Sequence, residues 1–174
     1  MNGQANPQLA LRPMVPNEAP VLAAIFRDSI AELTGEEYSE AQQEAWAAAA
    51  DDEAAFAERL ARELVIVATL GGAPAGFASL EADDKIGFCY VHSAAAGQGV
   101  GATLADALEK LAAARGVESL NVDASDSARE FFASRGYIAR QRNSVRCSDH
   151  WLANTTMRKN LVQAGEVASP KGAS

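Results

Sequence analysis

The sequence predicts an α/β (α+β) fold in which one mixed, mostly antiparallel sheet of about seven strands carries helices on both faces. Apolar residues alternate with period two in short segments and repeat with the helical period in the longer stretches between them. Gly71-Gly72 joins two central segments with a turn typical of a hairpin, so these strands should be antiparallel. With 174 residues, 48% hydrophobic and 22% charged, the chain suits one domain with a substantial core.

The first third of the chain predicts one strand and three helices. Residues 9–14 alternate as a short strand. The segment 16–18 opens a helix whose apolar stripe ends before Gly35, and Ser39 is a typical N-cap for a second helix. A third helical segment covers residues 51–62. The helices of this part therefore precede most of the sheet.

The rest of the chain predicts six more strands and two more helices. The strands are expected over 64–70, 75–81, 86–91, 118–123, 137–146 and 154–160, and the helices over 99–116 and 125–134. A polar loop that holds His150 and Trp151 is expected between the last two strands. These elements define a single domain over residues 9–161, with a loose N-terminus over 1–8 and a flexible tail over 162–174.

Charge is spread unevenly along the chain. The formal net charge of −8 disfavours nucleic-acid binding, because phosphate backbones attract clustered Lys and Arg. Residues 18–63 hold twelve acids against three Arg, whereas residues 129–159 hold seven Arg or Lys against two acids. The acidic part favours a cationic substrate, and the basic part favours a polyanion such as a phosphorylated cofactor. Two solvated faces would explain the same pattern equally well.

The cysteines and histidines predict neither a metal site nor a disulfide framework. Cys89 and Cys147 lie far apart in the sequence, and His92 and His150 do not have metal-ligand spacing around them. We assign His92 a structural role. No segment has the pattern of a signal peptide or of a bilayer-spanning helix. We therefore expect a cytoplasmic protein with no bound metal and no membrane partner.

A glycine-rich turn over residues 96–101 is the main candidate for a binding site. It follows a predicted strand and opens a predicted helix, where free backbone N–H groups favour an anionic phosphate. It is not a P-loop, because no Gly-Lys-Ser/Thr follows it. It is also a poor dinucleotide-binding fingerprint, because it comes after an antiparallel hairpin in the middle of the chain. A tight connection that binds no ligand remains the alternative.

The segments around this turn resemble the GCN5-related N-acetyltransferases. The resemblance rests on Tyr90-Val-His-Ser93, on the glycine turn, and on Ala128-Arg-Glu-Phe-Phe-Ala-Ser-Arg-Gly-Tyr137, and it extends over residues 9–161. The front half is similar to a bacterial, uncharacterised branch of that family. The resemblance implies acetyl-CoA as co-substrate. It implies the following cofactor-binding residues: Tyr90, Val91, Ala96, Gly97, Gln98, Gly99, Val100, Gly101, Ala102, Ser127, Phe132 and Arg135.

Three positions depart from the family pattern. Ala96 stands where a Gln or Arg usually begins the pyrophosphate motif, and Ser93 stands where a Pro is usual. Phe132 stands where many members have the Tyr that serves as general acid. A leaving thiol with a pKa of about 8.5 forgoes about 2 kcal/mol at pH 7 without such an acid, which is a modest penalty. Transfer without that tyrosine therefore stays feasible.

The resemblance implies direct transfer of an acetyl group to a primary amine of a small molecule or peptide. A backbone N–H near Tyr90 or Val91 would stabilise the oxyanion. Tyr90 and Asp123 are the candidate catalytic side chains, and Glu81 and Asp28 are further candidate bases. Candidate acceptor-binding residues are Ser29, Tyr38 and Trp46.

Two other functions remain open from the sequence. A CoA-binding sensor that has lost catalysis is suggested by Ala96 and Phe132, and another kind of nucleotide-binding domain is suggested by the glycines alone. Many relatives of this kind pair as homodimers, so a homodimer is one expectation. The identity of the amine is not predicted.

Overall fold

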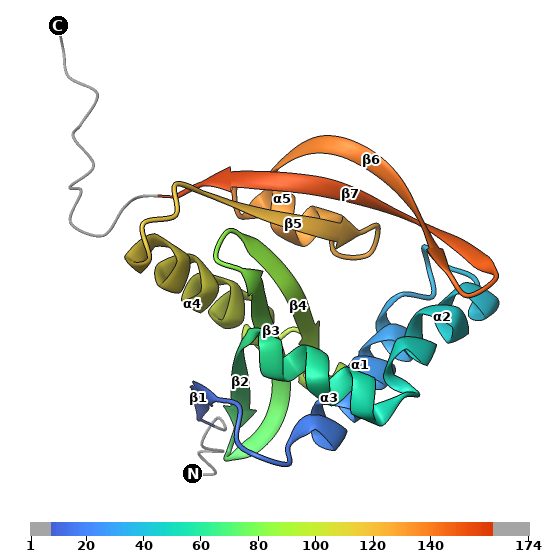
Figure 1. Ribbon diagram of the computed structural model, residues 1–174, viewed down its shortest axis with the longest axis horizontal. Helices are drawn as coiled ribbons and strands as arrows, with labels where there is room; N and C mark the ends of the chain where they lie inside the picture. The colour runs from blue at the N-terminus through green and yellow to red at the C-terminus, as the bar shows by residue number, and fades with distance from the viewer. Residues whose placement is uncertain (1–7, 162–174) are drawn as a thin grey trace, which may run out of the picture.

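A computed structural model of the chain describes residues 8–161 (Figure 1). The elements follow the predicted order: β1 (Leu9–Pro13), α1 (Ala19–Leu33), α2 (Glu40–Ala47), η1 (Ala48–Ala50), α3 (Glu53–Arg62), β2 (Leu64–Leu70), β3 (Ala73–Ala82), β4 (Lys85–Val91), η2 (Ser93–Ala95), α4 (Val100–Ala114), β5 (Ser119–Ser125), α5 (Arg129–Ser134), β6 (Ile138–Cys147) and β7 (His150–Asn160). Except for residue 8, the expected loose termini lie outside the described residues.

The seven strands form one sheet in the order β1-β2-β3-β4-β5-β7-β6. Every neighbouring pair is antiparallel except β4 and β5, which are parallel. The predicted mixed, mostly antiparallel sheet is therefore confirmed. The parallel pair lies at the centre of the sheet, and the pairing there joins β1–β4 to β5–β7–β6.

Helices cover both faces of this sheet, as predicted. On one face α4 packs against β2, β3 and β4, and α5 packs against β5. On the other face α1 contacts β3 and β4, while α3 contacts β2. The short helix α2 reaches from α1 to the β6–β7 hairpin, which extends over it (Figure 1). No helix within the described part of the chain is both long enough and apolar enough to cross a membrane.

The start of each of three helices follows from local sequence. Ser39 and Gln42 form a reciprocal capping box at the N-terminus of α2, and the Asp52 carboxylate accepts the N–H of Ala55 at the start of α3. Gly99 caps α4 in the left-handed conformation, with a φ of 81° that glycine adopts without steric cost. The cap predicted at Ser39 is confirmed.

The predicted polar loop between the last two strands is wrong. The segment with His150 and Trp151 belongs to β7, which pairs with β6 from the opposition of Cys147 and His150 onward. The turn consists of residues 148–149 alone. The polar residues at the hairpin tip favoured a loop in the sequence analysis. The segment nevertheless alternates as a strand does, with Trp151 exposed and Leu152 buried.

The predicted start of α5 is also wrong. Ser125 was expected to open this helix, but it is the last residue of β5 and pairs with Asn154 of β7. The helix begins four residues later, at Arg129. Pairing with a neighbouring strand extends β5, and this long-range contact outweighs the local preference of Ser for a helix cap.

Candidate active site

The parallel strands β4 and β5 separate soon after they pair. Their register includes only Lys85 opposite Asn121 and Ile86 opposite Val122. Beyond Ile86 the register of β4 with β3 also shifts, because one extra residue lies between Ile86 and Cys89. This β-bulge bends β4 next to the place where the two strands diverge.

Buried polar groups support the bulge from the α3 side. The Ser79 hydroxyl accepts the N–H of Phe88 at 2.8 Å and donates to the Glu63 carboxylate at 2.8 Å. Glu63, whose side chain is only 3% exposed, also pairs with Arg59 at 2.9 Å. A Cβ at Gly87 would lie 2.0 Å from a Glu63 oxygen. The Glu63 carboxylate therefore occupies the space above the bulge. No sequence pattern predicted this support, because its members come from the end of α3, from β3 and from β4.

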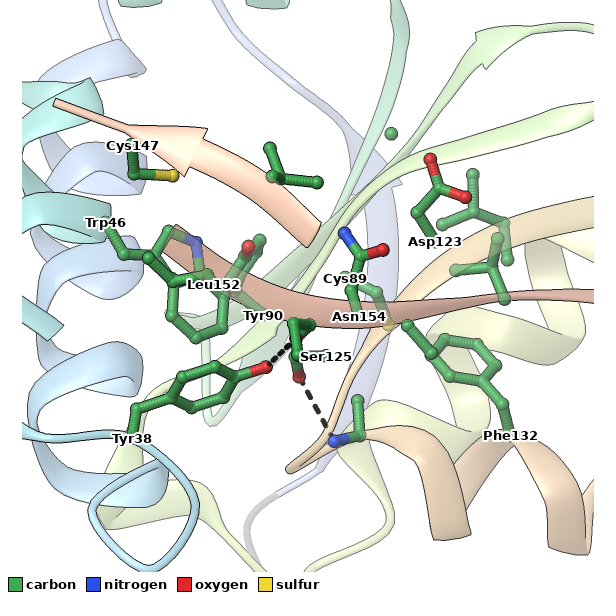
Figure 2. Close-up of a pocket in the computed structure, with 17 residues that line it drawn as sticks. Tyr38, Trp46, Cys89, Tyr90, Asp123, Ser125, Phe132, Cys147, Leu152 and Asn154 are labelled. Carbon is green, nitrogen blue, oxygen red and sulfur yellow. Dashed lines mark hydrogen bonds between the residues drawn. The ribbon is translucent and has the colours of Figure 1, made fainter. Parts of the chain in front are cut away.

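Two cavities, each of about 220 Å³, lie where β4 and β5 diverge. The loop-side cavity reaches Val91 and Gly101, beside the glycine turn. The arm-side cavity lies between α2 and the strands β5, β6 and β7, as Figure 2 shows. Both cavities are lined by Trp46, Cys89, Tyr90, Ser125, Ala128 and Phe132. Because they share these residues, the cavities meet beside the bulged strand.

The glycine turn lies at the N-terminus of α4. Gly97 and Gly99 both have positive φ, of 77° and 81°. A Cβ added at either position would meet no atom within 4 Å, so the space in front of the turn is open. The first amides of α4 have no intrahelical acceptor, by the geometry of any helix. The turn therefore has the free N–H groups, the space and the positive helix end that suit a phosphate group.

The loop that precedes the turn is held by α1. The Asp28 carboxylate accepts the Ser93 N–H at 2.7 Å and the Ser93 hydroxyl at 3.0 Å. His92 Nδ1 accepts the N–H of Ala94, and its Nε2 lies 3.5 Å from Asp28. Asp28, a candidate base from the sequence, therefore anchors this loop and lines neither cavity.

Tyr38 fastens the α1–α2 connection to the far half of the sheet. Its hydroxyl donates to the Ala153 carbonyl at 2.6 Å and accepts the Asp126 N–H at 2.9 Å. Burial raises the pKa of Tyr38, so this hydroxyl stays protonated at neutral pH. The Trp46 ring packs edge-on against it, with centroids 5.3 Å apart. Tyr38 thus fixes both the wall of the arm-side cavity and the turn after β5.

Tyr90 lies at the junction of the cavities. Its ring packs on Phe26 and lies 6.3 Å from the Trp46 ring. Burial raises the pKa of Tyr90, and a hydrogen bond from Trp46 offsets part of that rise. Cys89 points to the opposite face of the sheet, and burial raises its pKa to about 12. Neither group is a ready anion at neutral pH, so both act here as neutral groups.

The polar groups of the arm-side cavity are already paired. Asp123 accepts the Thr156 hydroxyl at 2.6 Å and lies 3.3 Å from the Lys85 ammonium. Asn154 accepts from Asn143 at 2.9 Å. Apolar residues from the last two strands complete the wall: Val145, Cys147 and Leu152.

The predicted site residues fall into three groups. Ser29, Trp46, Tyr90, Val91, Gly101, Ser127 and Phe132 line the loop-side cavity, and Tyr38 and Asp123 join Trp46, Tyr90 and Phe132 around the arm-side one. Ala96, Gly97, Gln98, Gly99, Val100 and Ala102 form the glycine turn and the start of α4. Arg135 lines neither cavity; its guanidinium pairs with Asp106 and Glu109 of α4.

Other lining residues had no signal in the sequence. Cys89, Ser125, Leu152 and Asn154 lie in or at the end of three strands, and Val145 and Cys147 lie in a fourth. Their alignment along one cavity depends on how strands far apart in the chain are paired. Only the alternation of β7 could have indicated Leu152 as an inward residue.

Comparison with known proteins identifies the family. The model of the acetyltransferase (GNAT) domain matches residues 34–161. The chain therefore belongs to the GCN5-related N-acetyltransferases. The uncharacterized N-acetyltransferase YafP of Escherichia coli (strain K12) is 31% identical over 150 residues, which are 86% of this chain and 95% of that protein.

Solved structures of the same family superpose on this fold. A GCN5-related N-acetyltransferase from Rhodopseudomonas palustris is 58% identical, with a TM-score of 0.87 over 92% of this chain and all of that one. The PaiA N-acetyltransferase of Thermoplasma acidophilum, solved in complex with coenzyme A, is 17% identical, with a TM-score of 0.73 over 88% of this chain and 99% of that one. At this low sequence identity, the similarity to the Thermoplasma acidophilum protein concerns the fold alone.

Proposed function

We propose that the chain transfers an acetyl group from acetyl-CoA directly to a primary amine of a small molecule or peptide. One observation carries this proposal: the open glycine turn at the N-terminus of α4 adjoins the loop-side cavity, and this cavity shares six lining residues with the arm-side cavity. The glycine turn would serve as the phosphate site, and the loop-side cavity next to it would serve as the channel for a flexible acyl carrier. The arm-side cavity would then be the separate pocket for an acceptor.

The residues present fit acetyl-CoA. The amides of the turn at Gly97, Gly99 and Gly101 would hold the pyrophosphate, and the absence of side chains at Gly97 and Gly99 leaves room for it. The loop-side cavity would take the pantetheine arm. The thioester would then lie among the residues that both cavities share, beside the backbone of the bulged strand. Two free thiols among the described residues suit a reducing compartment such as the cytoplasm, which we include in the proposal.

The surroundings of the junction favour a reaction driven by positioning. A neutral amine attacks the thioester carbon, the new C–N bond forms, the C–S bond breaks, and the amine gives up one proton while the thiolate gains one. An apolar cavity lowers the pKa of a buried amine, which helps to supply its neutral form. Asp123 lines the arm-side cavity with a partly exposed side chain, so it could take the released proton through solvent. Tyr90 stays protonated and can donate a hydrogen bond toward the leaving sulfur, a role that Phe132 cannot fill.

Phe132 also supports the second candidate, a CoA-binding sensor with weak catalysis. It is 3% exposed and lies where both cavities meet, so the usual acid is replaced by a hydrocarbon ring at the junction itself.

Calorimetry and an activity assay separate these functions. We expect acetyl-CoA to bind, and ATP and NAD to bind at least 100-fold more weakly. Thiol release with a panel of primary amines should then exceed the rate of acetyl-CoA hydrolysis. Binding without release on any amine would favour the sensor. No binding of acetyl-CoA by the folded protein would refute both.

A further inference from the structure

The arm-side cavity differs in charge from what the sequence led us to expect. The acid-rich region 18–63 suggested a cationic substrate, yet none of its twelve acids lines either cavity. Glu18, Asp28 and Glu63 are each engaged by partners elsewhere: Arg12, the loop before the glycine turn, and the bulge in β4. The acidic part of the chain therefore does not set the charge of the acceptor pocket.

The arm-side cavity is lined by one carboxylate, Asp123, and the ammonium group of Lys85 balances its charge. Asp123 is the only Asp, Glu, Lys, Arg or His among the residues that line the arm-side cavity. Its two oxygens are taken up by the Thr156 hydroxyl at 2.6 Å and by Lys85 at 3.3 Å. Such a cavity offers no excess negative charge to a ligand that carries a second or third ammonium group. The free-energy cost of removing water from these groups would then not be offset by an ion pair. A polyamine or an oligosaccharide with several amines is thus a poor occupant.

One part of the cavity wall is apolar and aromatic. Trp46 faces it from α2, and Val145, Cys147 and Leu152 face it from β6 and β7 (Figure 2). The Tyr38 hydroxyl, whose ring packs against Trp46, is already bound to two backbone groups. The volume of about 220 Å³ lies below the roughly 300–1,000 Å³ typical of sites for drug-sized ligands. Burial of an apolar group against this part of the wall would add to the affinity.

We infer that the acceptor is a small molecule with one primary amine on a flat apolar body, of the arylalkylamine kind. The inference rests on the proposed function, because it takes the arm-side cavity as the acceptor pocket. The amine would point to the junction at Tyr90, and the apolar body would lie between Trp46 and the wall formed by β6 and β7.

Acceptor preference provides the first test. Thiol release is measured with 2-phenylethylamine, spermidine and Nα-acetyl-lysine amide at saturating acetyl-CoA. We expect kcat/KM for 2-phenylethylamine to exceed that of each of the others at least tenfold. Equal rates, or a preference for spermidine or the lysine amide, would overturn the inference and leave the proposed function standing. No turnover of any amine would overturn both.

A charge placed in the wall provides the second test. Val145 is 41% exposed on the edge strand β6, so Val145→Glu should fold, and it adds a carboxylate to the arm-side cavity alone. We expect kcat/KM to fall at least tenfold for 2-phenylethylamine and to rise for spermidine, with the KM for acetyl-CoA within twofold. Val21→Glu is the matched control, because Val21 is 44% exposed and lines neither cavity. Equal effects of the two variants would overturn the inference.

Discussion

The glycine turn allows a direct test of where the cofactor binds, through the variant Gly99→Glu. Gly99 has a φ of 81° and caps α4, and a Cβ added there would meet no atom within 4 Å. A side chain at this position therefore projects into the open space in front of the helix. The cost to the folded protein is the left-handed conformation of a non-glycine residue, about 1–2 kcal/mol. The fold should survive this change.

The effect on binding follows from charge. A carboxylate about 5 Å from each of the two pyrophosphate charges, at an effective dielectric constant of about 40, gives a repulsion of about 3 kcal/mol. This repulsion corresponds to a loss of affinity of about 100-fold. Gly99→Ala is the matched control, since it has the same backbone strain without the charge. We expect Gly99→Ala to lose less than tenfold.

Isothermal titration of acetyl-CoA into the two variants and the natural protein measures this difference. Circular dichroism and thermal unfolding confirm that each variant is folded. If folded Gly99→Glu bound acetyl-CoA within twofold of the natural protein, the pyrophosphate would not lie at this turn. If the Ala and Glu variants lost the same affinity, strain rather than charge would account for the effect.

Three further predictions concern the framework around the site. Tyr38→Phe removes a buried hydroxyl that joins two backbone groups, so we expect a loss of about 1–3 kcal/mol in denaturant unfolding; a loss under about 0.5 kcal/mol would contradict the assigned bonds. Ser79→Ala leaves a buried N–H and one oxygen of Glu63 without their partner, and should cost about 2–3 kcal/mol by the same measurement. Arg142 hydrogen-bonds to Asp126 and lowers the pKa of that carboxyl below its ordinary value of 3.8. The stability from this pair is therefore complete above that value and is lost as the pH falls through the lower pKa of the folded protein. Arg142→Met should therefore flatten the pH dependence of the unfolding free energy below about pH 4. An unchanged pH profile would mean that Asp126 is not paired in solution.

Local signals account for the parts of the fold that could be predicted. Gly71-Gly72 lies at the hairpin turn, and Ser39 and Asp52 cap their helices, because each requirement is met within a few residues. The two boundary errors, at His150 and at Ser125, are both places where pairing with a distant strand extends a strand into a polar segment. Propensity is a weak guide where such pairing decides the conformation.

The partners of charged residues could not be predicted. Arg135 was predicted to bind the cofactor from its position in the family pattern, which stays a prediction, and the structure adds that its guanidinium pairs with acids on α4. Asp28 was a candidate base, yet it holds the loop before the glycine turn. Ion pairs form between elements that only the tertiary fold brings together, so composition alone gave a misleading picture of the charge around the arm-side cavity.

The sequence by itself determined the order of the elements, the seven-stranded mixed sheet and the position of the glycine turn, because periodicity and the positive φ of glycine are properties of short segments. Only the tertiary structure decided what the two cavities contain. In a strand, a shift of one residue turns every side chain to the other face, and the bulge after Ile86 makes such a shift at the junction. Which side chains line the two cavities therefore depends on strand register, which no local pattern specifies.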